Sequence, residues 1–562
     1  MVGCWKRARP ARIHPDRGPG WPREHAVSRP SLAGASALLL AVLASCTSGE
    51  PEVADVLLLG GTVLDGSGGP AVASDVAVRG ERITFLGDAA AAGVEAMDTV
   101  DVSGLLVTPG FIDMHSHAEL DEDYGRPGKA FLFQGITSVA LGVDGGGDDE
   151  VAAHLTRWAA DGIGVNAWLF VGHGTARREV MGMDARAPTP EEMEAMKAYV
   201  KKAMDEGALG LSSGLFYLPG SYAETEEVIE LNRVAAAYPG AIYDTHDRDL
   251  GAAYPSFGYL NSVAEGIRIG EEAGTKVIFS HFNPQGAQNY GRAPEGAALI
   301  EEAQARGVDV QAAQHVYTAT QSNLRSYTVP GWAVAGGDSA MVRRFDHPDT
   351  VRVIDAQTRE MLAIRGGAEK LLLVDPRPEL NGRTLAEKAA EWGVSAPEAA
   401  RRILREGNAS VMNLDLYDVE NTRYLAGKPW MMTCTDGRDP GPGQAITHPR
   451  VFGAFTKKLK DMVLDDSVIE LPFAVRSMTG LAADYMGWQD RGYLRVGYAA
   501  DVAVLDLGRV RDLATYEDPQ QYSEGTVHVL VNGVFAIRDG EATGALAGVP
   551  LVRGGGVFRA GA

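Results

Sequence analysis

The sequence predicts an α/β protein built on a (β/α)8 barrel of the TIM type. Three observations lead to this prediction. The apolar segment Val107–His117 ends in His115-Ser-His117, and residues two apart on a strand share one face. Later strand-like segments also end in residues that ligate metals or transfer protons, namely His246, His281 and Asp436. Strand-like and helical segments alternate, as a parallel barrel requires. Barrels gather their chemistry at the C-terminal strand ends, so we expect these side chains to meet.

The remaining barrel elements follow in order. Apolar runs at Ile136–Val143 and Val165–Gly172 are expected as the second and third strands, and Val308–Tyr317 as the seventh. Segment Thr189–Met204 is expected as a helix, because a threonine N-cap followed by proline is a typical helix start.

About a hundred residues separate the seventh strand from the eighth, Pro429–Asp436. A single barrel helix needs far fewer. The charged, helical pieces in this stretch are Asp349–Ile364, Thr384–Glu391 and Ala396–Gly407. We therefore expect a helical insertion at about 330–428 within a barrel that covers residues 109–489.

Both flanks of the barrel contain strands separated by glycine-rich turns. Asp55–Asp65 and Asp75–Gly87 precede the barrel, within residues 51–108. Ala499–Asp506 and Val527–Arg538 follow it, within residues 490–562.

Composition restricts the classes of partner. The chain has 562 residues, of which 45% are apolar, and a net charge of −22. Nucleic-acid binding needs a basic surface, so this charge argues against it. Three cysteines cannot build a disulfide framework, and we expect Cys434, within the eighth strand, to be a buried thiol.

Residues 1–50 differ from the rest of the chain. The apolar run Leu32–Cys46 is too short to span a bilayer but fits the core of a signal peptide. Its end, Leu43-Ala-Ser-Cys46, resembles a bacterial lipobox. This pattern predicts a lipoprotein attached to the membrane through Cys46, on the extracytoplasmic side of a bacterial cell envelope. The alternative is a translated leader without a function of its own.

Several motifs resemble those of one family. They are Pro109–His117, Gly172-His173-Gly-Thr-Ala-Arg177, Gly207–Gly220, Ser280-His281-Phe282, Thr435-Asp436-Gly437, His448-Pro-Arg450 with Gly453 and Phe455, Met478–Ala483 and Asp490–Asp506. In this order they resemble the amidohydrolase superfamily, and within it the N-acyl-D-amino-acid deacylases (D-aminoacylases). The similarity runs from about Ala54 to the C-terminus.

The resemblance implies both a fold and a reaction. It implies that the two flanking segments join into one small β-sandwich beside the barrel. It also implies metal-dependent hydrolysis of the amide bond of a small-molecule N-acyl-D-amino acid. The cofactor implied is one or two zinc ions, or another divalent metal, since zinc accepts imidazole and carboxylate ligands.

The site residues follow motif by motif. The resemblance implies that His115, His117, His246 and His281 ligate metal and that Asp436 transfers the proton from water to the leaving amine. The family has a metal-ligating cysteine after the second strand, where this chain has Asp144. A carboxylate is a competent zinc ligand and can bridge two metals, so we predict that Asp144 replaces the thiolate. The alternative is an aspartate that caps a glycine-rich turn.

The substrate-binding stretch also departs from the family. In the family a Tyr-Pro-Tyr-Thr-Ala-Gly-Ser-like segment helps to hold the substrate carboxylate, whereas here His315 and Gln321 replace the first tyrosine and the serine, and Tyr317 remains. Arg450 keeps its motif and could pair a carboxylate in bidentate fashion. His173 matches a motif whose role is either substrate binding or structural.

Two other interpretations stay open at this point. The pocket departures are compatible with another amidohydrolase, such as a dipeptidase or a cyclic-amide hydrolase. The second interpretation is a binding protein whose barrel has lost its enzymatic activity, but the intact set of metal-ligand residues argues against it. The sequence does not determine the oligomeric state.

Overall fold

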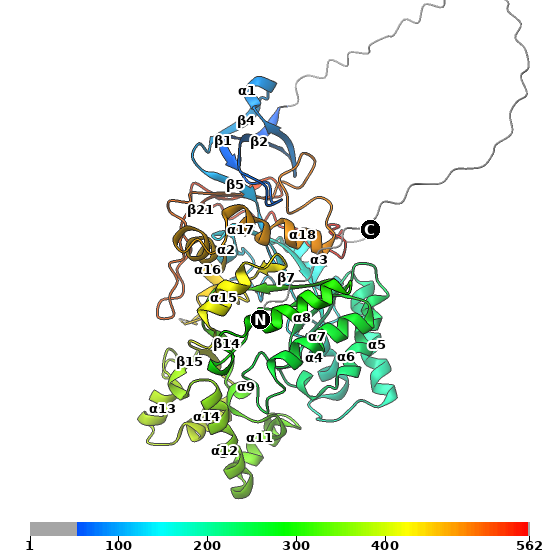
Figure 1. Ribbon diagram of the computed structural model, residues 1–562, viewed down its shortest axis with the longest axis vertical. Helices are drawn as coiled ribbons and strands as arrows, with labels where there is room; N and C mark the ends of the chain where they lie inside the picture. Colours follow the sequence, from blue (N-terminus) through cyan, green and yellow to red (C-terminus); the bar gives the residue numbers. More distant parts are fainter. Residues whose placement is uncertain (1–52, 445, 560–562) are drawn as a thin grey trace, which may run out of the picture. The chain divides into compact units, whose positions relative to one another are not determined.

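A computed structural model describes residues 53–444 and 446–559; Cys46 and the segment around it lie outside the described residues. The parallel strands come from the middle of the chain, coloured from blue through green to yellow in Figure 1. Two sheets contain them. The first has the order β6-β7-β8 and the second β17-β13-β12-β11-β10-β9. The bounds are β6 Phe111–Asp113, β7 Ile136–Leu141, β8 Asn166–Leu169, β9 Val171–Gly172, β10 Gly210–Gly214, β11 Ile242–His246, β12 Lys276–Phe279, β13 Val310–Gln314 and β17 Met431–Thr433.

Backbone hydrogen bonds connect the two sheets at both edges. β8 and β9 are consecutive parts of one extended segment, interrupted only at Phe170, whose amide donates to the Leu141 carbonyl at 2.8 Å. At the other edge the Asp436 amide donates to the carbonyl of His115, and the His117 amide donates to that of Gly437, both at 2.9 Å. The segments that follow β6 and β17 are therefore bonded to each other.

Helices connect the parallel strands, among them α3 (Val151–Asp161), α4 (His173–Met181), α5 (Pro190–Asp205), α6 (Thr225–Ala236), α7 (Tyr259–Ala273) and α8 (Ala293–Ala305). The predicted start of α5 is confirmed. Thr189 is the N-cap, its hydroxyl accepts from the Glu192 amide, and the Glu192 carboxylate accepts from the Thr189 amide. This capping box satisfies two amides that a helix end leaves unpaired.

The two flanking segments meet in one nine-stranded sheet. From the N-terminal side come β1 Ala54–Val63, β2 Val72–Arg79, β3 Arg82–Gly87, β4 Ala96–Asp101 and β5 Leu106–Pro109, and from the C-terminal side β18 Val502–Leu505, β19 Thr526–Val531, β20 Val534–Arg538 and β21 Glu541–Ala542. The antiparallel pairing of β5 with β18 joins them. The two flanking segments thus join, as predicted, in one continuous hydrogen-bonded sheet, and the packing of this sheet as a sandwich stays a prediction.

A buried carboxylate attaches this sheet to the parallel strands. Asp501, just before β18, accepts from the Asn166 side chain in β8 at 3.0 Å and from the Asn532 amide at 2.8 Å, and it pairs with Arg491. The burial of this charge is tolerable because hydrogen bonds and an ion partner surround it.

The insertion before β17 differs from the prediction. It begins before residue 330, with β14 (Thr320–Asn323), and contains an antiparallel sheet in the order β14-β16-β15, so it is not purely helical. β15 spans Leu371–Val374 and β16 spans Ser410–Asn413. Strands of four residues carry too little periodicity to be recognised in the sequence. The three predicted helices are present as α12 Pro348–Ile364, α13 Leu385–Glu391 and α14 Ala396–Glu406, beside α9 Leu324–Thr328 and α11 Asp338–Asp346 (Figure 1).

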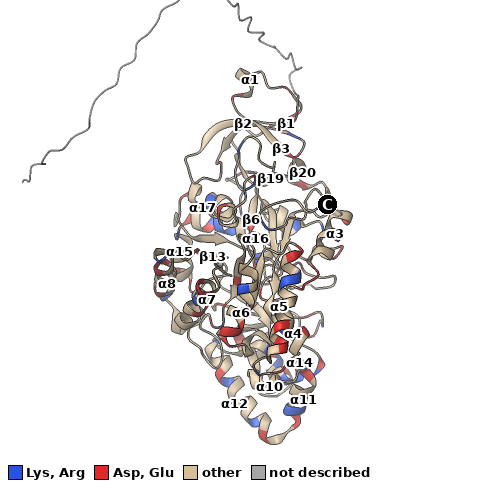
Figure 2. Cartoon of the chain, turned by 90° about the vertical axis from the view of Figure 1, so that its right-hand side faces the viewer, with Lys and Arg blue, Asp and Glu red and all other residues tan. Residues whose placement is uncertain are grey.

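Acidic and basic side chains are interspersed on helices such as α5, α11 and α12 (Figure 2). None of the helices in the described part of the chain combines the length and apolar character needed to cross a membrane.

Candidate metal centre

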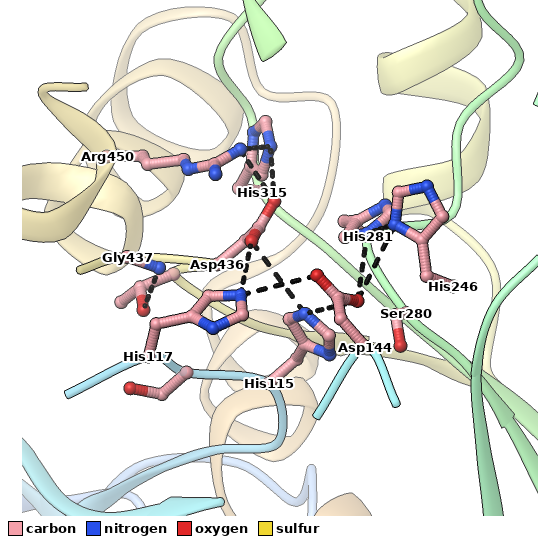
Figure 3. A network of polar contacts seen from close by, with 12 residues as sticks. His115, His117, Asp144, His246, Ser280, His281, His315, Asp436, Gly437 and Arg450 are labelled. Atoms are coloured by element: carbon pink, nitrogen blue, oxygen red, sulfur yellow. Dashed lines mark hydrogen bonds and ion pairs between the residues drawn. The ribbon is translucent and has the colours of Figure 1, made fainter. Parts of the chain in front are cut away.

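Six predicted site residues converge at the C-terminal ends of the parallel strands (Figure 3). Among the described residues, His115, His117, Asp144 and Asp436 form one group of possible ligands, and Asp144, His246 and His281 form a second. Within each group, one ligand atom from each residue lies within 4.8 Å of the others. Asp144 is common to both groups.

The Asp144 carboxylate lies between two pairs of histidines. Its Oδ1 is 3.4 Å from His115 Nε2 and its Oδ2 is 3.4 Å from His117 Nε2. On the other side, Oδ1 is 3.5 Å from His246 Nδ1 and 3.8 Å from His281 Nε2. Asp144 therefore lies within reach of both groups of possible ligands.

The donor atoms fit a divalent metal. Nε2 of His115 and Oδ1 of Asp144, which face each other at 3.4 Å, are both buried without a hydrogen-bond partner. Unpaired buried polar atoms are rare and need an explanation. His246 Nδ1 and His281 Nε2 also face each other at 2.7 Å. Imidazole nitrogens and carboxylate oxygens in this arrangement are the ligand types that zinc takes.

The pKa values of the aspartates and histidines in the site depend strongly on one another. Burial opposes ionisation of Asp144, but the neighbouring His115 and His246 hold its pKa well below the usual value. Burial likewise disfavours a charge on His115, yet Asp144 and Asp244 raise its pKa to about 9. Without metal, carboxylates and protonated rings therefore neutralise each other, and a cation would take the place of the protons.

Three of the site residues have a positive φ. Asp144, His281 and Asp436 have φ of 56°, 32° and 48°, in or near the left-handed region, which aspartate and histidine adopt more often than most other L residues. Such conformations persist only where the surroundings enforce them, and they cluster at functional sites.

Asp436 also contacts the substrate-binding candidates. Its Oδ2 is 2.6 Å from Arg450 Nη1, and Arg450 Nη1 is 3.2 Å from His315 Nε2. Burial together with the Arg450 charge lowers the pKa of His315 well below its usual value. His315 is therefore a neutral ring whose Nε2 accepts from Arg450 and orients it.

The other predicted substrate-binding residues do not all lie in one place. Gln321 lines the cavity above Asp436, and its Oε1 accepts from the His448 amide at 3.0 Å. Tyr317 points elsewhere, because its hydroxyl donates to Asp512 at 3.1 Å. His173 is fully buried, with Nε2 3.0 Å from the carboxylate of Glu227, which also pairs with Arg177. Neither Tyr317 nor His173 is among the residues that line the two cavities described below, and a role of either in substrate binding stays a prediction.

Two buried carboxylates in the site have no counterpart among the predicted residues. Asp113 Oδ2 accepts from the Thr435 hydroxyl at 2.6 Å, and Asp113 Oδ1 accepts from the His115 amide at 3.2 Å, which holds the first and last strand ends together. Asp244 lies 3.7 Å from His115 Nδ1. Its position two residues before His246, on the same strand face, is the signal that could have indicated it.

A cavity of about 520 Å³ opens above the metal centre. Asp144, Asp436 and Arg450 form its floor, and residues of the insertion, from β14 to β16, form much of its wall. A smaller cavity of about 20 Å³, lined by His246, His281 and Tyr417, adjoins Asp436 on the inner side. The larger cavity reaches Asp144, which both ligand groups share, whereas the smaller one has room for about one water molecule.

Comparisons with known proteins show the family to which the chain belongs. A model of the amidohydrolase family matches residues 98–537. D-aminoacylase of Alcaligenes xylosoxydans xylosoxydans is 36% identical over 525 residues, which cover 89% of this chain and 98% of that protein. N-acyl-D-glutamate deacylase of the same organism is 34% identical, covering 86% of this chain and 93% of that protein.

Solved structures give the same result. The crystal structure of a D-aminoacylase superimposes with a TM-score of 0.75 at 31% identity, covering 89% of this chain and all of that one. N-acyl-D-glutamate deacylase from Bordetella bronchiseptica, in complex with zinc and a phosphonate mimic of the tetrahedral intermediate, also has a TM-score of 0.75, at 29% identity and the same coverage. The chain therefore belongs to the amidohydrolase family, among the D-aminoacylases and N-acyl-D-amino-acid deacylases.

Proposed function

We propose that this protein is a zinc-dependent hydrolase that cleaves the amide bond of N-acyl-D-amino acids, with its site at the C-terminal rim of a (β/α)8 barrel. One observation carries the proposal. The Asp144 carboxylate lies between two pairs of histidines, 3.4 to 3.8 Å from their ring nitrogens, in two groups of ligand atoms. The D configuration rests on the related D-aminoacylase and N-acyl-D-glutamate deacylase.

His115, His117 and Asp144 would hold one zinc ion, and Asp144, His246 and His281 a second. When bound, zinc polarises the amide carbonyl and acidifies a water molecule. A structure of D-aminoacylase describes a binuclear centre in which one metal activates and the second attenuates. We propose a binuclear centre here as well, in which Asp144 would offer a ligand oxygen to each metal position.

Asp436 is proposed as the group that moves the proton. Its Oδ1 lies 3.3 Å from His117 Nε2 and its Oδ2 faces Arg450, so it stands between the ligand group and the substrate cavity. Its pKa is held low, against the effect of burial, by Arg450 and His281. The carboxylate is thus ionised, and it takes the proton of the attacking water at Oδ1 and returns it to the leaving nitrogen.

Arg450 is proposed to bind the α-carboxylate of the substrate. It is buried, its Nε has no hydrogen-bond partner, and it borders the cavity beside Asp436. Gln321 forms part of the adjoining wall and offers a neutral amide.

The charge of the cavity favours a neutral substrate side chain. Arg438 and Arg450 are the only lysine or arginine residues among the described residues that line the two cavities. Arg438 is already paired with Glu119 at 2.8 Å, and Asp375 adds a further carboxylate to the wall. An acidic side chain would therefore find no free cation once Arg450 holds the α-carboxylate.

We also propose that the protein is a lipoprotein of the cell envelope, attached through Cys46. The support for this is the apolar run that ends in Leu43-Ala-Ser-Cys46.

Substrate preference tests the proposed reaction. We expect kcat/KM to be far higher for N-acetyl-D-glutamine and N-acetyl-D-leucine than for their L enantiomers, and at least about tenfold higher than for N-acetyl-D-glutamate, a difference of about 1.4 kcal/mol. Release of free amine over a panel of enantiomer pairs measures this. Preference for L enantiomers or for a cyclic amide would overturn the proposed function, and preference for D-glutamate would overturn only the neutral side chain.

Substitutions at the two aspartates should have different consequences. Asp436→Asn should keep zinc, because His115, His117 and Asp144 remain, but lose about two to four decades of turnover, the usual contribution of a general acid–base group.

Asp144→Ala should lose zinc and activity together, and Asp144→Cys should recover zinc because a thiolate is a strong zinc ligand. Elemental analysis beside turnover decides: a full zinc complement in Asp144→Ala contradicts the bridging role.

Zinc uptake should depend steeply on pH. In the metal-free site the pKa of His115 is about 9, above its ordinary value, so the ring carries a proton at neutral pH that zinc must displace. The apparent zinc affinity should therefore increase as the pH is raised from about 6 to 8. Competition with a chromophoric chelator at each pH measures it, and a flat profile after correction for the chelator would contradict the exchange of protons for metal.

The mature N-terminus should carry lipid on Cys46. Mass spectrometry of protein from a lipoprotein-processing bacterial host should show cleavage before Cys46 and acylation of that residue. The Cys46→Ser variant should remain unacylated and leave the membrane fraction. An intact peptide that contains unmodified Cys46 in the wild-type protein would refute the anchor.

A further inference from the structure

We propose that Asp244 is a positioning residue that holds the segments bearing the metal ligands in register and fixes the orientation of the His115 ring. The inference rests on the proposed metal centre, and it concerns a residue outside both ligand groups. Asp244 lies in β11, and its side chain is fully buried.

Both oxygens of Asp244 are engaged. Oδ1 accepts from the Ser280 hydroxyl at 2.8 Å, and Oδ2 accepts from the Ser212 hydroxyl at 2.8 Å. Oδ1 also lies 3.7 Å from His115 Nδ1, within ion-pair range. The carboxylate thus joins β10, β11, the end of β12 and the end of β6.

Each of these contacts is made to a proposed metal ligand or to a residue close to one in the chain. Ser280 directly precedes His281, whose φ of 32° needs support. Ser212 accepts from the Gly145 amide at 2.9 Å, and Gly145 directly follows Asp144. His246 lies two residues after Asp244 on the same strand face. A single buried carboxylate therefore acts on the segments that carry His115, Asp144, His246 and His281.

The carboxylate of Asp244 also faces one ring nitrogen of His115. Burial of a carboxylate is costly unless polar groups surround it, and here two serine hydroxyls donate to it while the His115 ring lies on its remaining side. His115 Nδ1 is the ring nitrogen that faces it, while Nε2 faces Asp144. A proton on Nδ1 leaves the Nε2 lone pair free for metal, and carboxylates that orient a ligating histidine in this way strengthen metal binding.

Zinc affinity of the substituted protein, measured without substrate, tests the inference. Asp244→Asn keeps the size of the side chain but removes the charge, and loss of such an orienting group typically lowers metal affinity about 10- to 100-fold. We expect a loss of this size by chelator competition, with an altered visible spectrum of the cobalt-substituted protein. Ser280→Ala should give a smaller loss, and Asp244→Glu should recover part of it.

The matched control is Asp75→Asn. Asp75 is a buried carboxylate of the nine-stranded sheet that accepts from the amides of Gly60 and Ala89, remote in sequence from every ligand. The Asp75→Asn substitution should lower the free energy of unfolding without changing zinc affinity.

Asp244→Asn with unchanged zinc affinity and an unchanged cobalt spectrum would overturn the inference, even if the stability of that variant falls. If Asp244→Asn does not fold, an unchanged zinc affinity in Ser280→Ala overturns it instead. Absence of zinc binding in the wild type would refute the proposed function itself.

Discussion

The placement of one carboxylate between four imidazole rings governs this structure. The backbone of Asp144 adopts a φ of 56° in a glycine-rich turn that packs closely against β9. No side chain fits between them, because a Cβ on Gly172 of β9 would lie 2.3 Å from the carbonyl oxygen of Gly145 in the turn. The turn must approach β9 and β10 this closely to bring the carboxylate over the strand ends. Much of the local sequence, above all its glycines, follows from that constraint.

The surrounding architecture serves the same end. Backbone bonds between the segments after β6 and β17 bring Asp436 next to His115 and His117. Asp113 reinforces that junction by accepting from Thr435 and from the His115 amide. Because the ligands come from strands far apart in sequence, their geometry is only as rigid as these cross-connections. Rigid support of this kind is what a preorganised metal site requires.

The substrate side of the site belongs to the insertion. β14 and the segment around β16 bring neutral amides and hydroxyls to the wall of the cavity, and Asp375, directly after β15, adds a carboxylate. Asp144 and Asp436 reach the cavity from the ends of parallel strands. Arg450 stands at the boundary between them, paired with Asp436 and oriented by the neutral His315 ring. In the function proposed above, the strand ends would carry the reaction and the insertion would influence the choice of substrate, because a connecting segment can vary without disturbing the strands.

The sequence by itself determined the α/β class and the order of strands. It also indicated the ligand candidates, because strand periodicity and position in the chain are local properties that a single sequence displays. Tertiary structure alone decided which of the candidates meet. Tyr317 turns toward Asp512 and His173 toward Glu227, whereas Asp113 and Asp244 enter the site. These outcomes depend on partners up to several hundred residues away, and no local pattern encodes such contacts. The short sheet of the insertion was not predicted for the same reason, because its strands are recognisable only by their pairing with one another.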